Sequence, residues 1–176
     1  MLLKTLLLGA IATTAVASTA MADGHEGKRA RDGEVKIIYW QAPSILNPYL
    51  SGGTKDLESS SLVIEPMGRY DNNGDIVPYL AVETPTVANG GVSKDLTSIT
   101  WKLKEGLQWS DGSDVTSADL VFTAEYCMHP EGGCAQLSKF DGIKSVDAID
   151  KLTTKVTFNQ PTPNPYGPFV GMATPI

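Results

Sequence analysis

The sequence contains few of the side chains that form catalytic and metal centres. Its 176 residues include only two histidines and two cysteines. His25 lies close to the N-terminus, no GxSxG motif occurs, and no glycine-rich phosphate loop precedes a helix. Nucleophilic, general-base and metal-dependent catalysis therefore have few candidate residues, and no metal or cofactor is expected.

Basic residues are also in the minority. Fourteen lysines and arginines face twenty aspartates and glutamates, which gives a formal net charge of −6. Proteins that bind nucleic acids need clustered basic side chains to neutralise the phosphates. The single basic cluster, KRAR at 28–31, lies in a polar segment and is typical of a solvated tail. The composition therefore excludes nucleic acid as an expected partner.

Long apolar runs are absent except near the N-terminus. Lys4 precedes the apolar run 6–17, and Ala-Met-Ala at 20–22 forms a small-x-small cleavage site. This layout predicts a secretory signal peptide over 1–22. A membrane-spanning helix would need about 20 continuous apolar residues, whereas threonines and serines interrupt this run. No cysteine follows it that could carry a lipid anchor, so we expect a soluble, periplasmic product without a membrane anchor.

Residues 23–34 are polar and charged, and we expect this lead-in to be disordered. One domain is then predicted over 35–176. VKIIYW at 35–40 is apolar on both faces, which favours a buried strand. A proline- and glycine-containing loop is predicted over 41–53, and helical spacing of apolar residues follows over 54–67.

Two hairpins and one alternating strand follow. Asp-Asn-Asn-Gly at 71–74 predicts a hairpin turn between two short strands. ITWKLK at 99–104 alternates apolar and polar residues, as in a half-buried strand. A second hairpin is predicted over 144–149 and 153–158. Because strands and helices are mixed without a regular βαβ order, the expected class is α+β (mixed α/β).

The stretch LQWSDGSDVTSADLVFTAEY at 107–126 contains four carboxylates, three of them aspartates. One interpretation is a secreted hydrolase whose cleft carboxylates are Asp111, Asp114 and Asp119. The spacing favours a structural role, because Ser-Asp-Gly predicts a turn. Thr116 also stands three residues before Asp119, as in a capping box. A calcium loop counted from Asp111 fails, since Thr116 occupies the glycine position and Phe122 the glutamate position.

The two cysteines lie close together in CMHPEGGC, as Cys127 and Cys134. In an oxidising compartment this spacing favours a disulfide that closes a short loop. A zinc site with His129 as third ligand is the alternative, although the motif supplies only three of the usual four ligands.

The order of these motifs resembles that of a known family. The stretch LKEGLQWSDGSDVTSADLVFTAEY is similar to the pattern LrxGvkWsDGxPvTAxDVvfT of the family 5 extracellular solute-binding proteins. YWQAPSILNPY precedes it and KSVDAIDKLTTKVTFNQPTP follows it in the family's order, so the resemblance covers 35–171. Family members are generally about three times as long, which makes this chain resemble an N-terminal fragment. An exported interaction module that is complete at this length is the alternative.

The resemblance implies part of the first lobe of a two-lobed, type II-like periplasmic binding protein that captures a solute for an ABC importer. The implied partners are a small solute, such as an oligopeptide or opine, and the permease subunits, with a monomer expected at full length. No catalysis is implied. Loops on a rigid scaffold commonly bind ligands. We therefore predict contacts from Trp40, Asn47, Tyr49 and Thr54, although the two aromatic residues are equally consistent with core packing.

Overall fold

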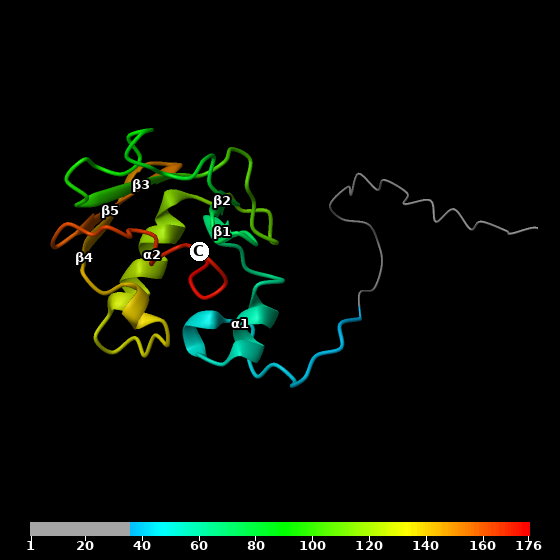
Figure 1. The fold of residues 1–176 in the computed structure, drawn as a ribbon. Coiled ribbons are helices and arrows are strands. Elements are labelled where there is room, and N and C mark those ends of the chain that lie inside the picture. The colour runs from blue at the N-terminus through cyan, green and yellow to red at the C-terminus, as the bar shows by residue number, and fades with distance from the viewer. Residues whose placement is uncertain (1–35) are drawn as a thin grey trace, which may run out of the picture. The chain divides into compact units, whose positions relative to one another are not determined.

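The computed structural model describes residues 36–176, and residues 38–176 form the compact unit described below. It combines helices with two small antiparallel sheets, so the predicted α+β class is confirmed (Figure 1). In chain order the elements are η1 (Pro48–Leu50), α1 (Thr54–Ser60), β1 (Gly68–Tyr70), β2 (Ile76–Pro78), β3 (Ser98–Lys102), α2 (Ser117–Met128), η2 (Leu137–Lys139), β4 (Ile143–Asp150) and β5 (Thr153–Phe158).

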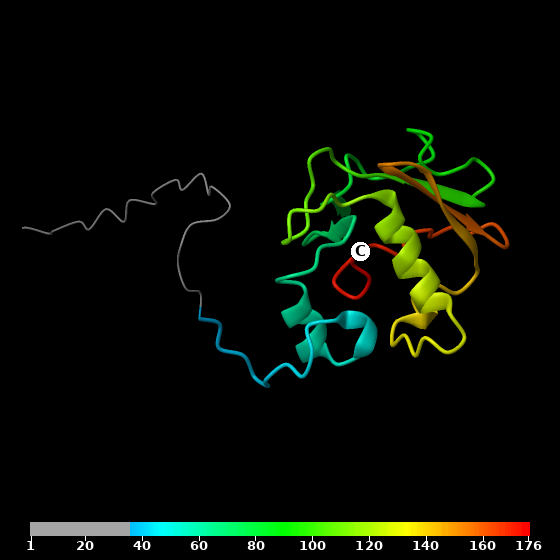
Figure 2. The ribbon, with the colours of Figure 1, turned by 180° about the vertical axis from the view of Figure 1, so that it is seen from behind.

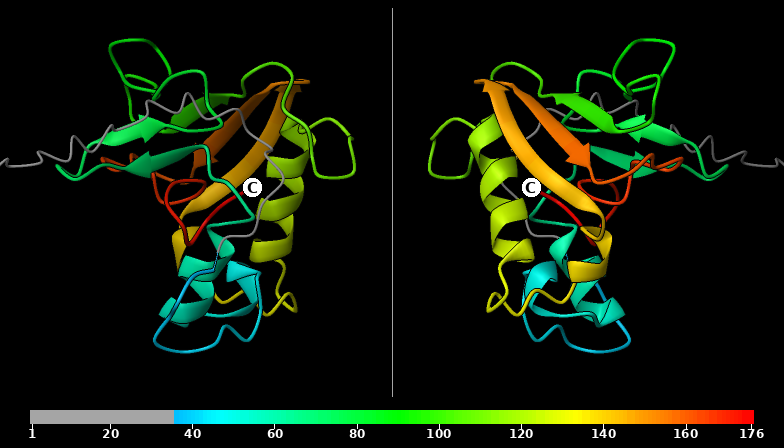
Figure 3. Two further views of the ribbon diagram at one scale, coloured as in Figure 1. Left: turned by 90° about the vertical axis from the view of Figure 1, so that its right-hand side faces the viewer. Right: turned by 90° about the vertical axis from the view of Figure 1, so that its left-hand side faces the viewer.

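The larger sheet has the strand order β3-β5-β4, and both pairings are antiparallel. This confirms the alternating strand predicted around 99–104 and the hairpin predicted over 144–158. Ile99 and Trp101 point into the core, as their alternation predicts. The β4–β5 register is regular around Val146 and is interrupted on both sides of it. α2 packs across β4 and β5 and covers one face of the sheet (Figure 3).

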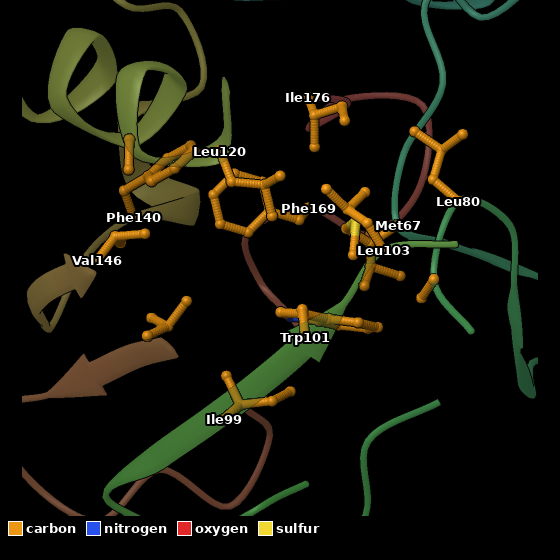
Figure 4. Close-up of a cluster of buried hydrophobic side chains, with 14 of the residues drawn as sticks. Met67, Leu80, Ile99, Trp101, Leu103, Leu120, Phe140, Val146, Phe169 and Ile176 are labelled. Atoms are coloured by element: carbon orange, nitrogen blue, oxygen red, sulfur yellow. The ribbon is translucent and has the colours of Figure 1, made fainter. Parts of the chain in front are cut away.

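The core lies between α2, the large sheet and the C-terminal segment (Figure 4). Phe169 is completely buried at its centre, and its ring meets that of Phe140 edge-on at a centroid distance of 5.9 Å. The backbone also connects the C-terminal segment to earlier residues, because Met67 N–H donates to Phe169 O at 2.9 Å. Residues far apart in the sequence thus form one apolar cluster, which burial of their side chains stabilises.

The smaller sheet is the predicted hairpin of β1 and β2. Its turn is fixed by Asp71, whose Oδ1 accepts hydrogen bonds from the N–H groups of Asn73 at 2.8 Å and Asp75 at 2.9 Å. Gly74 has φ +87°, a conformation that glycine adopts without steric cost. The local sequence therefore determines this turn.

Two predicted elements differ from the structure. The buried strand expected at 35–40 is wrong over the described residues 36–40, where Ile38 is 99% exposed and Trp40 is 70% exposed. Within residues 38–176 no neighbouring strand pairs with this segment, and a strand without a partner leaves its backbone groups without ladder hydrogen bonds.

The helix expected over 54–67 is too long, because α1 ends at Ser60. Pro66 cannot continue a helix and also disfavours the helical conformation at the preceding residue. Met67 is instead fully buried in the core, beyond the helix. The N-cap position of α1 is occupied by Gly53, and Thr54 is the first residue of the helix.

Among residues 36–176, no helix is both long and apolar enough to cross a lipid bilayer. The predicted signal peptide at 1–22 and the lead-in at 23–34 lie outside the described residues.

Candidate functional site

A cavity of about 430 Å³ lies where α2 faces the segment around η1. In Figures 1 and 2 the C-terminal segment, drawn in red, passes between these two parts of the molecule. The lining side chains are mainly large and apolar or aromatic, with a few polar groups among them. They are Asn47, Tyr49, Leu50, Ile64, Trp109, Asp119, Phe122, Thr123, Tyr126 and Ile176.

The first wall is formed by Asn47 and η1. Asn47 is the N-cap of this short helix, and its Oδ1 accepts a hydrogen bond from Tyr49 N–H at 2.9 Å. The Tyr49 hydroxyl donates to Pro175 O, and burial raises the pKa of Tyr49 above its ordinary value. The Tyr49 side chain therefore stays protonated and connects this wall to the C-terminal segment.

A second set of contacts attaches this wall to the loop closed by the cysteines. Gln136 is buried, and its Nε2 donates to Pro48 O at 3.1 Å and Ser51 O at 3.2 Å. Ala135 N–H donates to Tyr49 O at 2.8 Å. These bonds begin directly after Cys134, which is joined to Cys127 in a disulfide. The predicted disulfide is therefore confirmed, and it lies next to the residues that hold η1.

Asp56 of α1 holds the other side of the same wall. Its carboxylate accepts hydrogen bonds from Ser44 N–H at 2.6 Å and from the Ser51 hydroxyl at 2.7 Å. These bonds, with that from Ser51 contributing most, hold the pKa of Asp56 well below its ordinary value. A carboxylate that stays ionised is thus the fixed acceptor that orders residues 44–51.

The second wall is the face of α2 that carries Asp119, Phe122, Thr123 and Tyr126. The predicted capping box is present at its start. Thr116 N–H donates to Asp119 Oδ2 at 2.7 Å, and the Thr116 hydroxyl donates to the same oxygen at 3.1 Å. Asp119 thereby fixes the first turn of the helix while its side chain borders the cavity.

The three carboxylates of the hydrolase hypothesis are engaged in separate structural contacts. Asp111 accepts hydrogen bonds from the N–H and hydroxyl of Ser113 at 2.9 and 2.7 Å, and these bonds lower its pKa. Asp114 forms an exposed ion pair with Lys151 at 2.7 Å. Of the three, Asp119 alone lines the cavity. Within residues 36–176, no group of three histidine, cysteine or acidic side chains is arranged to hold a metal ion.

The four predicted contact residues divide into two pairs. Asn47 and Tyr49 line the cavity together, whereas Trp40 and Thr54 do not line it. Trp40 is largely exposed, and its ring lies against that of Tyr39 at a centroid distance of 5.8 Å. Thr54 is an exposed residue at the start of α1. Ligand contact by any of the four stays a prediction.

Sequence reasoning missed most of the second wall. The helical period of Leu120, Ala124, Cys127 and Met128 predicts one apolar face of this helix, and the first three are buried while Met128 is half-buried. Phe122 and Tyr126 recur four residues apart on another face of the same helix, which is a readable signal. Trp109 both contacts the core and lines the cavity.

Sequence comparison connects the chain to transport proteins. Residues 75–176 match the profile described as "Bacterial extracellular solute-binding proteins, family 5 Middle". Over 151 residues the chain is 26% identical to the glutathione-binding protein GsiB of Escherichia coli strain K12. This match includes 86% of the chain and 27% of GsiB, so the chain spans about a quarter of the length of this relative.

Solved structures show the same fold. The pheromone receptor PrgZ, a peptide-binding protein, superposes with a TM-score of 0.66 at 21% identity, over 77% of this chain and 29% of PrgZ. The murein tripeptide binding protein MppA of Escherichia coli superposes with a TM-score of 0.65 at 22% identity, over the same shares of the two chains. This chain corresponds to less than a third of the length of each of these two neighbours.

Proposed function

Because this chain belongs to the family 5 bacterial extracellular solute-binding proteins, we propose that it captures a short peptide or a related small solute for an ABC importer. The observation that carries the proposal is the cavity between η1 and α2. Its volume of about 430 Å³ and its largely apolar lining with a few polar groups are typical of small-molecule sites. The relatives named for binding glutathione, a pheromone peptide and a murein tripeptide support a peptide-like solute.

The proposed location is the periplasm, reached through cleavage of a signal peptide over 1–22. The proposed partner in the membrane is the permease of the importer. In this mechanism the described segment supplies one wall of the binding cleft. Closure of two lobes around the solute then creates the form that docks on the permease. Capture needs no covalent chemistry, so the proposal includes no enzymatic step.

Thermal unfolding of the full chain in the presence of candidate solutes tests the proposal. Oligopeptides, opines and amino-sugar derivatives are compared with a neutral sugar at the same concentration. A solute present at 100 times its Kd stabilises the folded state by about 2.7 kcal/mol and raises Tm accordingly. We expect such a shift from at least one peptide-like solute and none from the sugar.

Two outcomes would contradict the proposal. If no solute raises Tm, the proposed binding function is wrong. Recovery of a cleaved or otherwise modified solute after incubation, detected by mass spectrometry, would favour the hydrolase. A Phe122→Ala variant tests whether the solute binds in the cavity, because it removes a lining side chain. Phe122 is 70% exposed, so its loss leaves the core intact.

A further inference from the structure

A second cavity, of about 270 Å³, lies where η2 meets the end of β1 and the segment 164–174. It shares no lining residue with the cavity between η1 and α2. The proposed solute-binding function makes no use of it. Its larger lining side chains are Tyr70, Lys139, Asn164, Tyr166, Val170 and Met172.

The floor of the second cavity is held by contacts within the C-terminal segment. Thr174 is 1% exposed, and its hydroxyl donates to Val170 O at 2.9 Å and lies 3.3 Å from Gly167 O. Gly167 packs directly on the backbone of η2, because a Cβ at this position would lie 2.9 Å from Lys139 O. The floor and the backbone of Lys139 are therefore fixed relative to each other before a ligand arrives.

The Tyr166 side chain forms a rigid wall. Its hydroxyl donates to Pro85 O at 2.7 Å, and its ring meets that of Trp101 edge-on at a centroid distance of 6.4 Å. Trp101 is fully buried in the core. Because the ring is anchored at both ends, it offers a flat apolar surface for a second ring.

The polar groups of the second cavity are donors. Lys139 is the single lining residue that carries a charge at neutral pH. Within residues 36–176, the Lys139 ammonium and the Tyr70 hydroxyl have no hydrogen-bond or ion-pair partner. Asn164 uses Oδ1 to accept from Tyr166 N–H at 3.4 Å, so its amide NH₂ remains to donate. Three donors with one positive charge and no acidic side chain match a carboxylate, whose two oxygens only accept.

From these features we propose that the second cavity is a separate binding site for a small aromatic carboxylate. The carboxylate accepts from Lys139, Asn164 and the Tyr70 hydroxyl, and the ring of the ligand packs against Tyr166 and Val170. A volume of about 270 Å³ is near the lower end of the range for small-molecule sites, which favours a ligand with one ring. Neutral aromatic molecules lack the charge that this site pairs with.

NMR titration of the full chain tests this site with two probes, benzoate and benzamide. The two molecules have the same ring, and only benzoate carries a negative charge. We expect benzoate to move the backbone amide signals of Gly167, Gly171 and Ala173 and to leave that of Asn47 in place. Benzamide should bind about tenfold more weakly, because a charge-assisted hydrogen bond contributes more than a neutral one.

Two lysine variants separate a specific contact from general charge attraction. Lys139→Gln should lower the affinity for benzoate to that for benzamide. Lys139 is exposed, so the urea midpoint of this variant should match that of the wild type. Lys144→Gln removes an exposed lysine of β4 outside the cavity and should bind benzoate as the wild type does.

Several results would overturn the site. These are equal affinity for the two probes, unchanged benzoate binding by Lys139→Gln, and no movement of the three signals. Movement of the Asn47 signal in their place would show that benzoate enters the cavity between η1 and α2. The proposed function is tested separately by the thermal screen. A peptide-like solute that raises Tm in a chain that does not bind benzoate removes this site alone.

Discussion

Asp56 shows how one carboxylate orders a loop and makes stability depend on pH. Its pKa is lowered in the folded state by the hydroxyl of Ser51 and the N–H of Ser44. In the unfolded chain the pKa of an aspartate is about 3.9. The unfolded state therefore binds a proton in acid before the folded state does. The stabilisation is fully present above the unfolded pKa and is lost as pH falls below about 4.

We predict that Asp56→Asn flattens the acid limb of the stability curve. The measurement is the free energy of unfolding in urea between pH 2 and 6, for the variant and the wild type. Ser51→Ala is the matched variant, because it removes the hydrogen bond that lowers the pKa of Asp56 most and keeps the carboxylate. It should reduce the pH dependence partially. Equal slopes for the wild type and Asp56→Asn would contradict the assignment.

Among the elements, the loop closed by Cys127 and Cys134 has the clearest energetic consequence. It follows α2, and the residues directly after it hold η1 through Ala135 and Gln136. Closing a loop of about eight residues stabilises the fold by about 2.5 kcal/mol in the chain-entropy account. We predict that reduction lowers the free energy of unfolding by about that amount and also weakens solute binding, because the first wall of the cavity loses its support.

Urea denaturation with and without a phosphine reductant measures this effect. Cys134→Ser is the control, because it removes the crosslink and keeps Cys127, which is 1% exposed in the core. Its stability should match that of the reduced wild type and should not change when reductant is added. A reductant effect in this variant would show that another process destabilises the protein.

The elements that sequence reasoning predicted correctly are those fixed by neighbouring residues. The turn at Asp71 and the cap at Asp119 are both made by side chains bonding to backbone groups within four residues. The strand expected at 35–40 and the continuation of the first helix beyond Ser60 are wrong. Apolar spacing does not specify which neighbouring segment is available for pairing or packing. Two of the four predicted contact residues, Asn47 and Tyr49, line the cavity, and their contact with a ligand stays a prediction.

The α2 half of the cavity was not foreseen, because its use depends on which segments pack against the helix. Leu120 and Ala124 lie on the buried face of α2, whereas Phe122 lies on another face and is exposed. The contacts of η1 with Ala135 and Gln136 hold this segment opposite the Phe122 face, where the two parts border a cavity. Those contacts join residues more than eighty positions apart, and no local pattern encodes them.

At the scale of the whole molecule, the tryptophans report where the core lies. Trp101 is fully buried, whereas Trp40 is 70% exposed. We predict that Trp101→Ala lowers the free energy of unfolding by about 3–5 kcal/mol, as expected for removal of a large core side chain. Trp40→Ala should change it by no more than about 0.5 kcal/mol. Chemical denaturation of both variants followed by circular dichroism measures the difference.

Similar losses for the two variants would show that the segment around Trp40 packs into the core. A small loss for Trp40→Ala together with weaker solute binding would instead identify this residue as a ligand contact, which sequence reasoning predicts. The same pair of variants therefore decides between the two interpretations of Trp40 that the sequence left open.

The interrupted register of β4 has a consequence for solubility. β4 is the last strand in the order β3-β5-β4, and within residues 36–176 no further strand pairs with its outer edge. An open edge is a template for strand addition by another molecule, which begins aggregation. The two register shifts bend this edge, and the exposed side chains of Lys144, Asp147 and Asp150 place charge along the strand. These features disfavour growth of the sheet from one molecule to the next.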